Sequence, residues 1–293
     1  MRLGAAFGNI NMGTDWGVIR GLVHELEAAG FDGISTNDHV IGGHPDRAGD
    51  QRVHTSTTGV HEPLVYLSFI AAVTEQVELA TGVLLLPQRQ TTLVAKQCAE
   101  LDLLSGGRLR LGVGIGRNWM EYEALNEAFT NRGRRIEEQV EVLRHYWTSE
   151  HVTYQGQWHN LDRVGLNPMP IQRPIPIWMG SYFGFVNERV LERIGRMADG
   201  WMPQFPPADL EPILDRVKAY ARDAGRDPAE LGIECAIRTR PDDDPARWVD
   251  LAEAYRDLGA THLKVFSSGN SPAETVASMR RWLDAVGPVA KAA

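Results

Sequence analysis

Cysteine is scarce in this sequence, and long apolar runs are missing. The 293 residues contain two cysteines. Cys98 lies in an amphipathic helical pattern and Cys235 in an apolar, strand-like run, so two buried reduced thiols are favoured over a disulfide. No apolar run approaches the roughly 20 residues that span a bilayer, and no basic segment with an apolar core follows the amino terminus. The sequence therefore predicts a soluble, cytoplasmic protein with no membrane partner.

A strong positive charge and metal-binding motifs are missing as well. The formal net charge is -8, from 30 basic and 38 acidic residues spread along the chain, which argues against a nucleic-acid partner. Four histidines gather in one region, but no His-x-His, HExxH or Cys-x-x-Cys spacing accompanies His39, His44, His54 and His61. We therefore expect no metal, and the missing G-x-S-x-G elbow argues against serine-hydrolase chemistry.

What the sequence does contain is an alternation of strand-like and helical segments. The expected strands are 2–7, 33–36, 77–86, 108–114, 175–179, 200–203, 232–238 and 262–266. The expected helices are 15–29, 62–74, 93–104, 119–147, 187–197, 210–224, 245–258 and 272–286. Eight such alternations without a linker predict an α/β protein with a (β/α)8 TIM barrel, formed as a single domain over residues 1–293.

Two stretches exceed the ordinary length of a connecting loop. Residues 40–61 are polar and rich in glycine, histidine and aspartate, and residues 151–174 hold hairpin-like aromatic pieces followed by a proline-rich return. Long insertions in this fold tend to act as lids or pocket walls. We expect both insertions at the carboxyl-end face of the barrel.

A glycine-rich segment follows the fourth expected strand. The run G-V-G-I-G at residues 112–116 leads into a helical pattern that begins near Asn118. Glycines such as Gly114 let a ligand approach the backbone, and the first turn of a helix offers unpaired N–H groups to an anion. The same run also fits a tight strand-to-helix turn, because it lacks the full G-x-G-x-x-G spacing.

Five blocks in a fixed order resemble the bacterial luciferase-like superfamily of flavin and deazaflavin enzymes. They are FDGISTNDH at 31–39, LATGVLLLP at 79–87, LDLLSGGRLRLGVG at 101–114, IPIWMG at 175–180 and ADGW at 198–201. Within the superfamily, the sequence is most similar to oxidoreductases that depend on the deazaflavin coenzyme F420. The resemblance implies a (β/α)8 barrel whose cofactor ring lies across the carboxyl ends of the strands.

The end of the second strand supplies the catalytic candidates. Asp38 and His39 stand where side chains of a barrel point at the site, although a strand-ending turn with Asp38 as a cap or ion-pair partner fits the same residues. The resemblance makes His39 the general acid–base, since imidazole exchanges protons near neutral pH. Asp38 is then expected to orient His39 or to bind the polar edge of the cofactor ring.

Further cofactor contacts follow from the resemblance. Thr81, Gly82 and Val83 correspond to a bulge with a non-prolyl cis peptide behind the ring, and this is favoured over the alternative that Gly82 is only a glycine in a tightly packed strand. Gly180 and Ser181 correspond to the region that binds the cofactor phosphate. Nearby, Arg89 is either an anion contact or a solvated loop charge, and for Arg189 and Arg193 an exposed helix face is favoured over ligand binding.

Arg117 is the clearest departure from one branch of the relatives. Sugar-phosphate dehydrogenases of the F420 branch carry an acidic catalytic residue here, so the arginine argues against that chemistry. Arg117 either binds a carboxylate or phosphate of cofactor or substrate, or pairs with Glu121 or Glu123 one helical turn away. The ion pair is slightly favoured.

The expected activity is hydride transfer between F420 and a small organic substrate. One alternative is an FMN-dependent two-component monooxygenase supplied by a partner reductase, and another is a catalytically silent flavin-binding barrel. A flavin or F420 reductase is therefore an expected electron source. The strongly apolar segment 62–74, together with the pairing known for relatives, predicts a homodimer, with cover by the long loop before it as the alternative.

Overall fold

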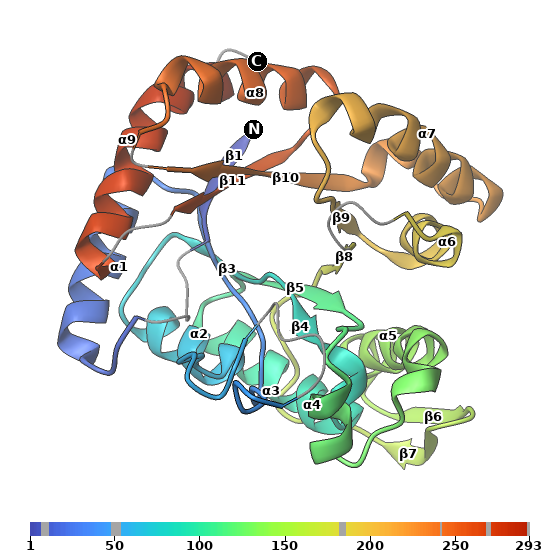
Figure 1. Cartoon of the computed structure of the whole chain (residues 1–293). Coiled ribbons are helices and arrows are strands. Elements are labelled where there is room, and N and C mark those ends of the chain that lie inside the picture. Colours follow the sequence, from blue (N-terminus) through green and yellow to red (C-terminus); the bar gives the residue numbers. More distant parts are fainter. Residues whose placement is uncertain (7–11, 48–53, 182–185, 241, 268–270, 292–293) are drawn as a thin grey trace.

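Parallel strands form a closed ring with helices outside it (Figure 1). The computed structural model describes residues 1–6, 12–47, 54–181, 186–240, 242–267 and 271–291. The neighbours run in the order β3-β2-β1-β11-β10-β9-β8-β5-β4, and pairing of β3 with β5 closes the ring. The predicted TIM barrel is confirmed. Its strands are β1 (Arg2–Ala5), β2 (Gly33–Thr36), β3 (Glu78–Thr81), β4 (Leu84–Leu85), β5 (Leu109–Gly114), β8 (Ile177–Gly180), β9 (Gly200–Met202), β10 (Gly232–Thr239) and β11 (His262–Ser267).

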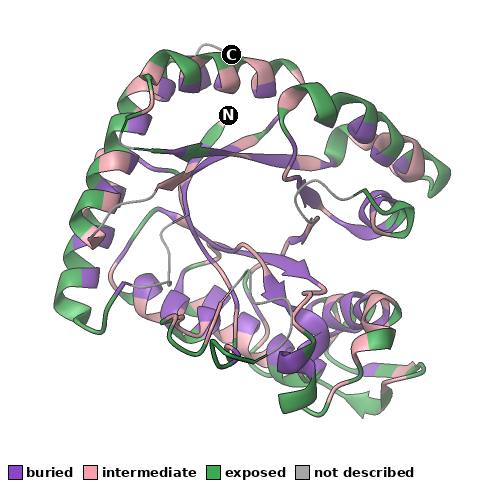
Figure 2. Ribbon diagram, viewed as in Figure 1, coloured by how far each residue is buried: buried purple, intermediate pink, exposed green. Residues whose placement is uncertain are grey.

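The helices turn their apolar faces to the sheet and their polar faces to solvent (Figure 2). Short polar side chains set several starts: Asp15 caps α1 through the Gly17 amide at 2.9 Å, and Asp244 caps α8 through the Ala246 amide at 3.0 Å. The long helices are α1 (Trp16–Ala29), α2 (Pro63–Ala72), α3 (Thr91–Leu104), α5 (Arg132–Thr148), α6 (Glu188–Met197), α7 (Pro207–Asp223), α8 (Pro245–Asp257) and α9 (Pro272–Lys291).

Two expected elements are interrupted. The helix expected over 119–147 is divided into α4 (Trp119–Ala124), the 3-10 turn η2 (Phe129–Asn131) and α5, because Asn126 adopts a left-handed φ of 56°. The strand expected over 77–86 is divided into β3 and β4 by a cis peptide between Gly82 and Val83. That cis bond is the one that the family resemblance implied, so this expectation is confirmed.

The two insertions lie in different places. Residues 40–61 leave the carboxyl end of β2, as predicted, and their described part is joined by a bridge between Gly43 and Thr55. Residues 151–174 continue from the end of α5 and form a hairpin of β6 (Val152–Gln155) and β7 (Asn160–Val164). The expectation of a second insertion over the carboxyl face is wrong, because α5 returns the chain to the amino ends of the strands before the insertion begins.

The hairpin packs outside the barrel, against α5 (Figure 1). Glu138 of α5 accepts hydrogen bonds from the amides of residues 157–159 and lies 2.8 Å from His159 Nδ1. His159 Nε2 reaches the Thr91 hydroxyl at the start of α3, at 2.6 Å. The insertion is therefore attached to the helical layer rather than to the barrel mouth.

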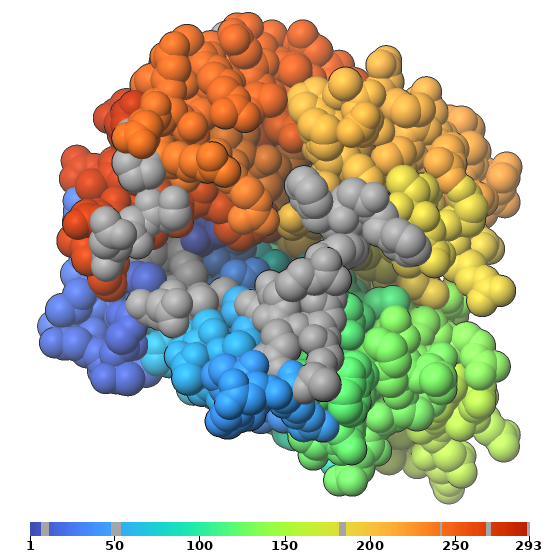
Figure 3. Space-filling view, in the orientation of Figure 1, coloured from blue at the N-terminus to red at the C-terminus, as the bar shows by residue number. Residues whose placement is uncertain are grey.

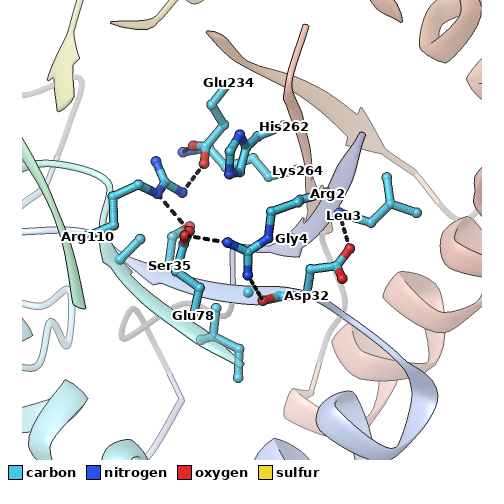
Figure 4. Close-up of a pocket in the computed structure, with 13 residues that line it drawn as sticks. Arg2, Leu3, Gly4, Asp32, Ser35, Glu78, Arg110, Glu234, His262 and Lys264 are labelled. Atoms are coloured by element: carbon cyan, nitrogen blue, oxygen red, sulfur yellow. Dashed lines mark hydrogen bonds and ion pairs between the residues drawn. The ribbon is translucent and has the colours of Figure 1, made fainter. Parts of the chain in front are cut away.

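Charged side chains fill the barrel interior near the amino ends of the strands (Figure 4). We call Glu78, Arg110, Glu234 and Lys264 the amino-end charge cluster. Arg110 Nε lies 2.7 Å from Glu78, its Nη2 pairs with Glu234, and Lys264 Nζ lies 2.5 Å from the other Glu234 oxygen. Burial alone would raise the pKa of Glu234, but Arg110 and Lys264 lower it to about 2. The cluster is therefore a set of mutually compensated ions.

Both cysteines are free and buried, as the sequence predicted. None of the helices in the described ranges is long and apolar enough to cross a membrane. In the space-filling view, the amino-terminal half of the chain forms the lower part of the visible face and the carboxyl-terminal half the upper part (Figure 3). The halves meet around the barrel axis, where the candidate site lies.

Candidate functional site at the barrel mouth

His39 is held by a buried carboxylate from a distant segment. Its Nδ1 lies 3.2 Å from Oε1 of Glu121, in the first turn of α4. The Val40 amide donates to the same oxygen at 2.9 Å, and Gln88 Nε2 lies 3.4 Å from Oε2. Glu121 has no solvent exposure, whereas the His39 side chain remains 17% exposed. The arrangement anchors one ring nitrogen of His39 and leaves the other unanchored by Glu121.

A second histidine packs against the first in a tilted arrangement. The ring of His54 lies 4.3 Å from the ring of His39 at an interplanar angle of 57°. Both rings line a small hollow of about 50 Å³, together with Val40, Ile41, Gly42, Thr55, Thr58 and Val60. Burial lowers the pKa of His54 to about 4, and the charges of His39 and Arg117 act in the same direction. His54 is therefore neutral at pH 7.

Asp38 is an ion-pair partner, which was the alternative role that the sequence allowed. Arg89 donates to both of its carboxylate oxygens, at 2.8 and 3.2 Å, and the Leu85 amide donates at 2.8 Å. Arg89 also binds Glu62, the cap of α2, at 2.8 Å. The expectation that Asp38 orients His39 is wrong, because Glu121 occupies that place. The expectation of a solvated loop charge for Arg89 is wrong too, because the residue is a largely buried link between two carboxylates.

Val83 lies between two of the glycines singled out in the sequence. A Cβ on Gly114 would lie 2.6 Å from Val83 Cγ2, and one on Gly180 would lie 2.8 Å from Val83 Cγ1. Any side chain at either position would therefore displace Val83. The structure thus brings together Gly82, Val83, Gly114 and Gly180. Gly114 and Gly180 leave room for the side chain of Val83, which lies between β3 and β4.

Ser181 is fixed at the end of β8 by its neighbours on β9. Its hydroxyl accepts a hydrogen bond from Trp201 Nε1 at 3.1 Å, and its amide donates to the Met202 carbonyl at 3.4 Å. The amide is therefore already engaged, while the hydroxyl keeps its own hydrogen to donate. Residues 182–185, which complete the expected phosphate cradle, lie outside the described residues.

The arginines of α6 differ from each other. Arg189 is exposed, as expected. Arg193 is buried and lies 2.9 Å from Glu137 of α5, so the expectation of an exposed residue is wrong there. Its guanidinium ties α6 to α5 and is not directed at a ligand.

Thr81 and Arg117 have different neighbours. The Thr81 hydroxyl is fully buried and donates to the Gly112 carbonyl at 2.6 Å, so it ties β3 to β5. Arg117 lies near His54, whose pKa it lowers. Glu121 binds His39 and Glu123 pairs with Arg47 at 3.2 Å, and the ion pair of Arg117 stays a prediction. Within the described part of the chain, no three acidic, histidine or cysteine side chains converge as metal ligands.

The sequence pattern of the luciferase-like monooxygenase family matches residues 3–287. The chain belongs to this family. The match begins at the second residue of β1 and covers all the other strands of the barrel completely. It includes the segments that carry His39, Glu121 and Val83. The protein is therefore a luciferase-like oxidoreductase, from a family that uses F420 or reduced FMN.

Both branches of the family occur among the relatives. An F420-dependent glucose-6-phosphate dehydrogenase of Kineococcus radiotolerans is 27% identical over 249 residues, 81% of this chain and 68% of that protein. An FMNH2-dependent dimethylsulfone monooxygenase of Pseudomonas fluorescens is 25% identical over 252 residues, 84% of this chain and 64% of that protein.

The fold is also that of a solved enzyme. An F420-dependent secondary alcohol dehydrogenase, in complex with an F420–acetone adduct, superposes with a TM-score of 0.81 at 17% identity. The superposition covers 97% of this chain and 98% of the other. At this identity the likeness establishes the barrel and does not extend to the substrate.

Proposed function

We propose that the protein transfers a hydride between coenzyme F420 and a small organic substrate, with His39 moving the accompanying proton. The observation that carries the proposal is His39 itself, which lies at the carboxyl end of β2, beside a small hollow, with Nδ1 bound to a buried carboxylate. An oriented imidazole is the usual acid–base group for chemistry at a carbonyl or hydroxyl oxygen. It also favours an active enzyme over a silent flavin-binding barrel.

The residues at the mouth suit a planar ring with an anionic tail. Val83 offers two methyl groups between Gly114 and Gly180, an apolar surface without a competing polar side chain. The Ser181 hydroxyl has a hydrogen left to donate to a phosphate or a ring oxygen. We assign Gly82, Val83, Gly114, Gly180 and Ser181 to this group, which supplies the carbon that gains or loses the hydride.

We assign the hollow beside His39 to the substrate, and Arg117 to an acidic group of the substrate or the cofactor. The neutral ring of His54 and the apolar side chains of Val40, Ile41 and Val60 favour a small substrate with one oxygen function. Arg117 is the nearby cation for an acidic substituent of cofactor or substrate. We assign Asp38 and Thr81 to the support of the site, because their polar atoms are bound to protein groups.

A second candidate is an FMN-dependent two-component monooxygenase that receives reduced flavin from a partner reductase. The observation in its favour is the likeness to the dimethylsulfone monooxygenase, which spans as much of this chain as the F420-dependent relative does. The residues that we assign to the cofactor suit the ring of F420 and the ring of FMN alike. The relative affinity for the two cofactors therefore distinguishes the two candidate functions.

Side-by-side fluorescence titrations with F420 and FMN test the cofactor. We expect tighter binding of F420 by the wild-type protein and weaker binding of either cofactor by Gly180→Ala, whose Cβ would displace Val83. The control is Gly225→Ala, the same substitution at a surface turn away from Val83. Its φ of 72° adds local strain to the turn but changes nothing at the barrel mouth. A clear preference of the wild type for FMN would overturn the proposal in favour of the monooxygenase.

We also propose a cytoplasmic homodimer. Apolar side chains on neighbouring helices remain exposed: Val65 of α2 by 66%, and Leu93 and Leu104 of α3 by 52% and 64%. The two free cysteines agree with a reducing compartment. Light scattering should give about twice the chain mass of 32.5 kDa, and Val65→Glu should lower it. A wild-type mass of one chain at micromolar concentration would contradict the dimer.

A further inference from the structure

The structure assigns a positioning role to Glu121: we infer that Glu121 and His39 form an acid–base dyad. In this dyad the carboxylate holds the Nδ1 proton of His39, and Nε2 is the atom that exchanges a proton with substrate. The inference rests on the proposed function for the reaction it serves, but its geometric part concerns only residues of this chain.

The first argument is the identity of the hydrogen-bond donor. Oε1 of Glu121 accepts from the Val40 amide at 2.9 Å and lies 3.2 Å from His39 Nδ1. An oxygen that already accepts an amide N–H acts as an acceptor toward the imidazole too, so the proton lies on Nδ1. Neutral His39 is therefore the Nδ1–H tautomer, and its lone pair is on Nε2, which Glu121 does not contact.

The direct partners of Glu121 in the described residues differ from those of the other buried carboxylates. In the described ranges, the contacts of Glu121 are His39, the Val40 amide and Gln88, and none of them is a lysine or arginine. By contrast, buried Asp38 and Glu234 both pair with an arginine. A buried carboxylate without a cation is costly. A positive charge formed on His39 would compensate it, so the site is organised for imidazolium.

The reaction balances with these residues. In the oxidative direction, the C–H bond of an alcohol breaks and its electron pair leaves as hydride to the deazaflavin, which is reduced. The alcohol O–H gives its proton to Nε2 of His39, and the carbonyl bond forms. The imidazolium then lies beside the Glu121 carboxylate. In the reductive direction, Nε2 returns that proton to the carbonyl oxygen as the hydride arrives.

Glu121→Gln separates charge from geometry at this position. The two close contacts use a single oxygen, so a glutamine Oε1 retains both donors. Its new amide group would face Gln88, whose own Oε1 is buried and lacks a hydrogen-bond partner within the described structure. Rotation of the Gln88 amide would pair the two groups. The variant therefore keeps the fold and the tautomer and removes only the negative charge.

Nitrogen NMR of the ligand-free protein, labelled at histidine with ¹⁵N, tests the geometry without any cofactor. We expect a protonated Nδ1 and an unprotonated Nε2 for neutral His39, with the signal assigned by its loss in His39→Gln. Glu121→Gln should keep that tautomer, and Glu121→Leu should lose the preference. A wild-type His39 protonated at Nε2 would overturn the dyad, whichever cofactor the enzyme uses.

Turnover then tests the charge. We expect Glu121→Gln to lower kcat roughly 10- to 100-fold with little change in substrate KM, because the carboxylate acts when the imidazolium forms. Glu123→Gln, the same change on an exposed residue of α4, should leave kcat unchanged. Unaltered kcat in a folded Glu121→Gln would overturn the dyad. A wild type inactive with F420 would instead refute the proposed function and leave the NMR result to decide the dyad.

Discussion

The two ends of the barrel both bury charge, but they balance it differently. At the amino end, Arg110 and Lys264 surround Glu234 and neutralise it within the cluster. At the carboxyl end, Glu121 is equally buried, and His39 is its one hydrogen-bond partner among the described side chains that can become positive. Protonation of a neighbouring group does not stabilise a carboxylate that is already paired with cations. It does stabilise a buried carboxylate whose partner is a neutral histidine. Incomplete pairing, and not the presence of buried ions, distinguishes the candidate site.

The histidines of the two ends sharpen the same point. Burial lowers the pKa of both His54 and His262 to about 4. His262 lies among the strand starts, where Trp178 packs edge-on against it at 4.8 Å. His54 lines the hollow beside His39. A depressed histidine pKa is therefore a mark of burial in this protein, and the neighbouring groups decide whether the residue belongs to a site.

The largest expected effect is at the carboxyl end. His39→Ala should lower turnover by roughly 10²- to 10⁴-fold, because the group that exchanges the substrate proton is lost. Cofactor affinity should remain nearly unchanged, since the proposed ring contacts belong to Val83, Gly114, Gly180 and Ser181. Steady-state kinetics and cofactor titration on the same preparation measure both. A large loss of affinity with retained turnover would show that His39 only packs against the cofactor.

At the amino end, the expected effect is on stability. Arg110→Met leaves buried Glu234 and half-buried Glu78 with too little positive charge, which should cost about 3–5 kcal/mol in the free energy of unfolding. Arg2→Met removes the exposed partner of Glu78 and should cost less than about 1 kcal/mol. Urea denaturation of both variants measures the difference. Equal costs would mean that the cluster is not a compensated unit.

The smallest expected effect is a pH dependence at the same end. The pKa of His262 is about 4 in the fold and 6.5 when exposed, so the unfolded chain takes up the proton first as pH falls. The contribution of the neutral ring is present above pH 6.5 and is lost between pH 6.5 and 4. Relative to His262→Gln, the wild type should lose about 2 kcal/mol between pH 7 and 4.5 in urea denaturation. Parallel pH curves would contradict the assignment.

Much of the frame could be predicted from sequence, because it depends on periodicity. The strand and helix alternation predicted the barrel, and the family resemblance predicted the cis bond between Gly82 and Val83. His39 was placed at the carboxyl end of β2 because the strand before it ends there. These inferences use residues that are close in the chain or a pattern repeated along it.

The partners within the site could not be predicted, because they come from distant segments. Asp38 precedes His39 and was chosen as its partner, but adjacent residues of an extended segment point to opposite sides. Asp38 therefore meets Arg89, and His39 meets Glu121 from α4. The acidic residue in the first turn after Asn118 was a signal for Glu121, although an acid there also fits the dipole of any helix.

The pairing of β1 with β11 has a consequence for how the chain reaches its fold. Arg2 is in register with His262 and Ala5 with Val265, so the ring closes by joining strands from nearly opposite ends of the sequence. Such long-range contacts slow folding and form late. A chain lacking β11 would present bare parallel edges on β1 and β10, which are templates for association with other chains. During synthesis, the edge of β1 therefore stays open to association with other chains until β11 has been made and pairs with it.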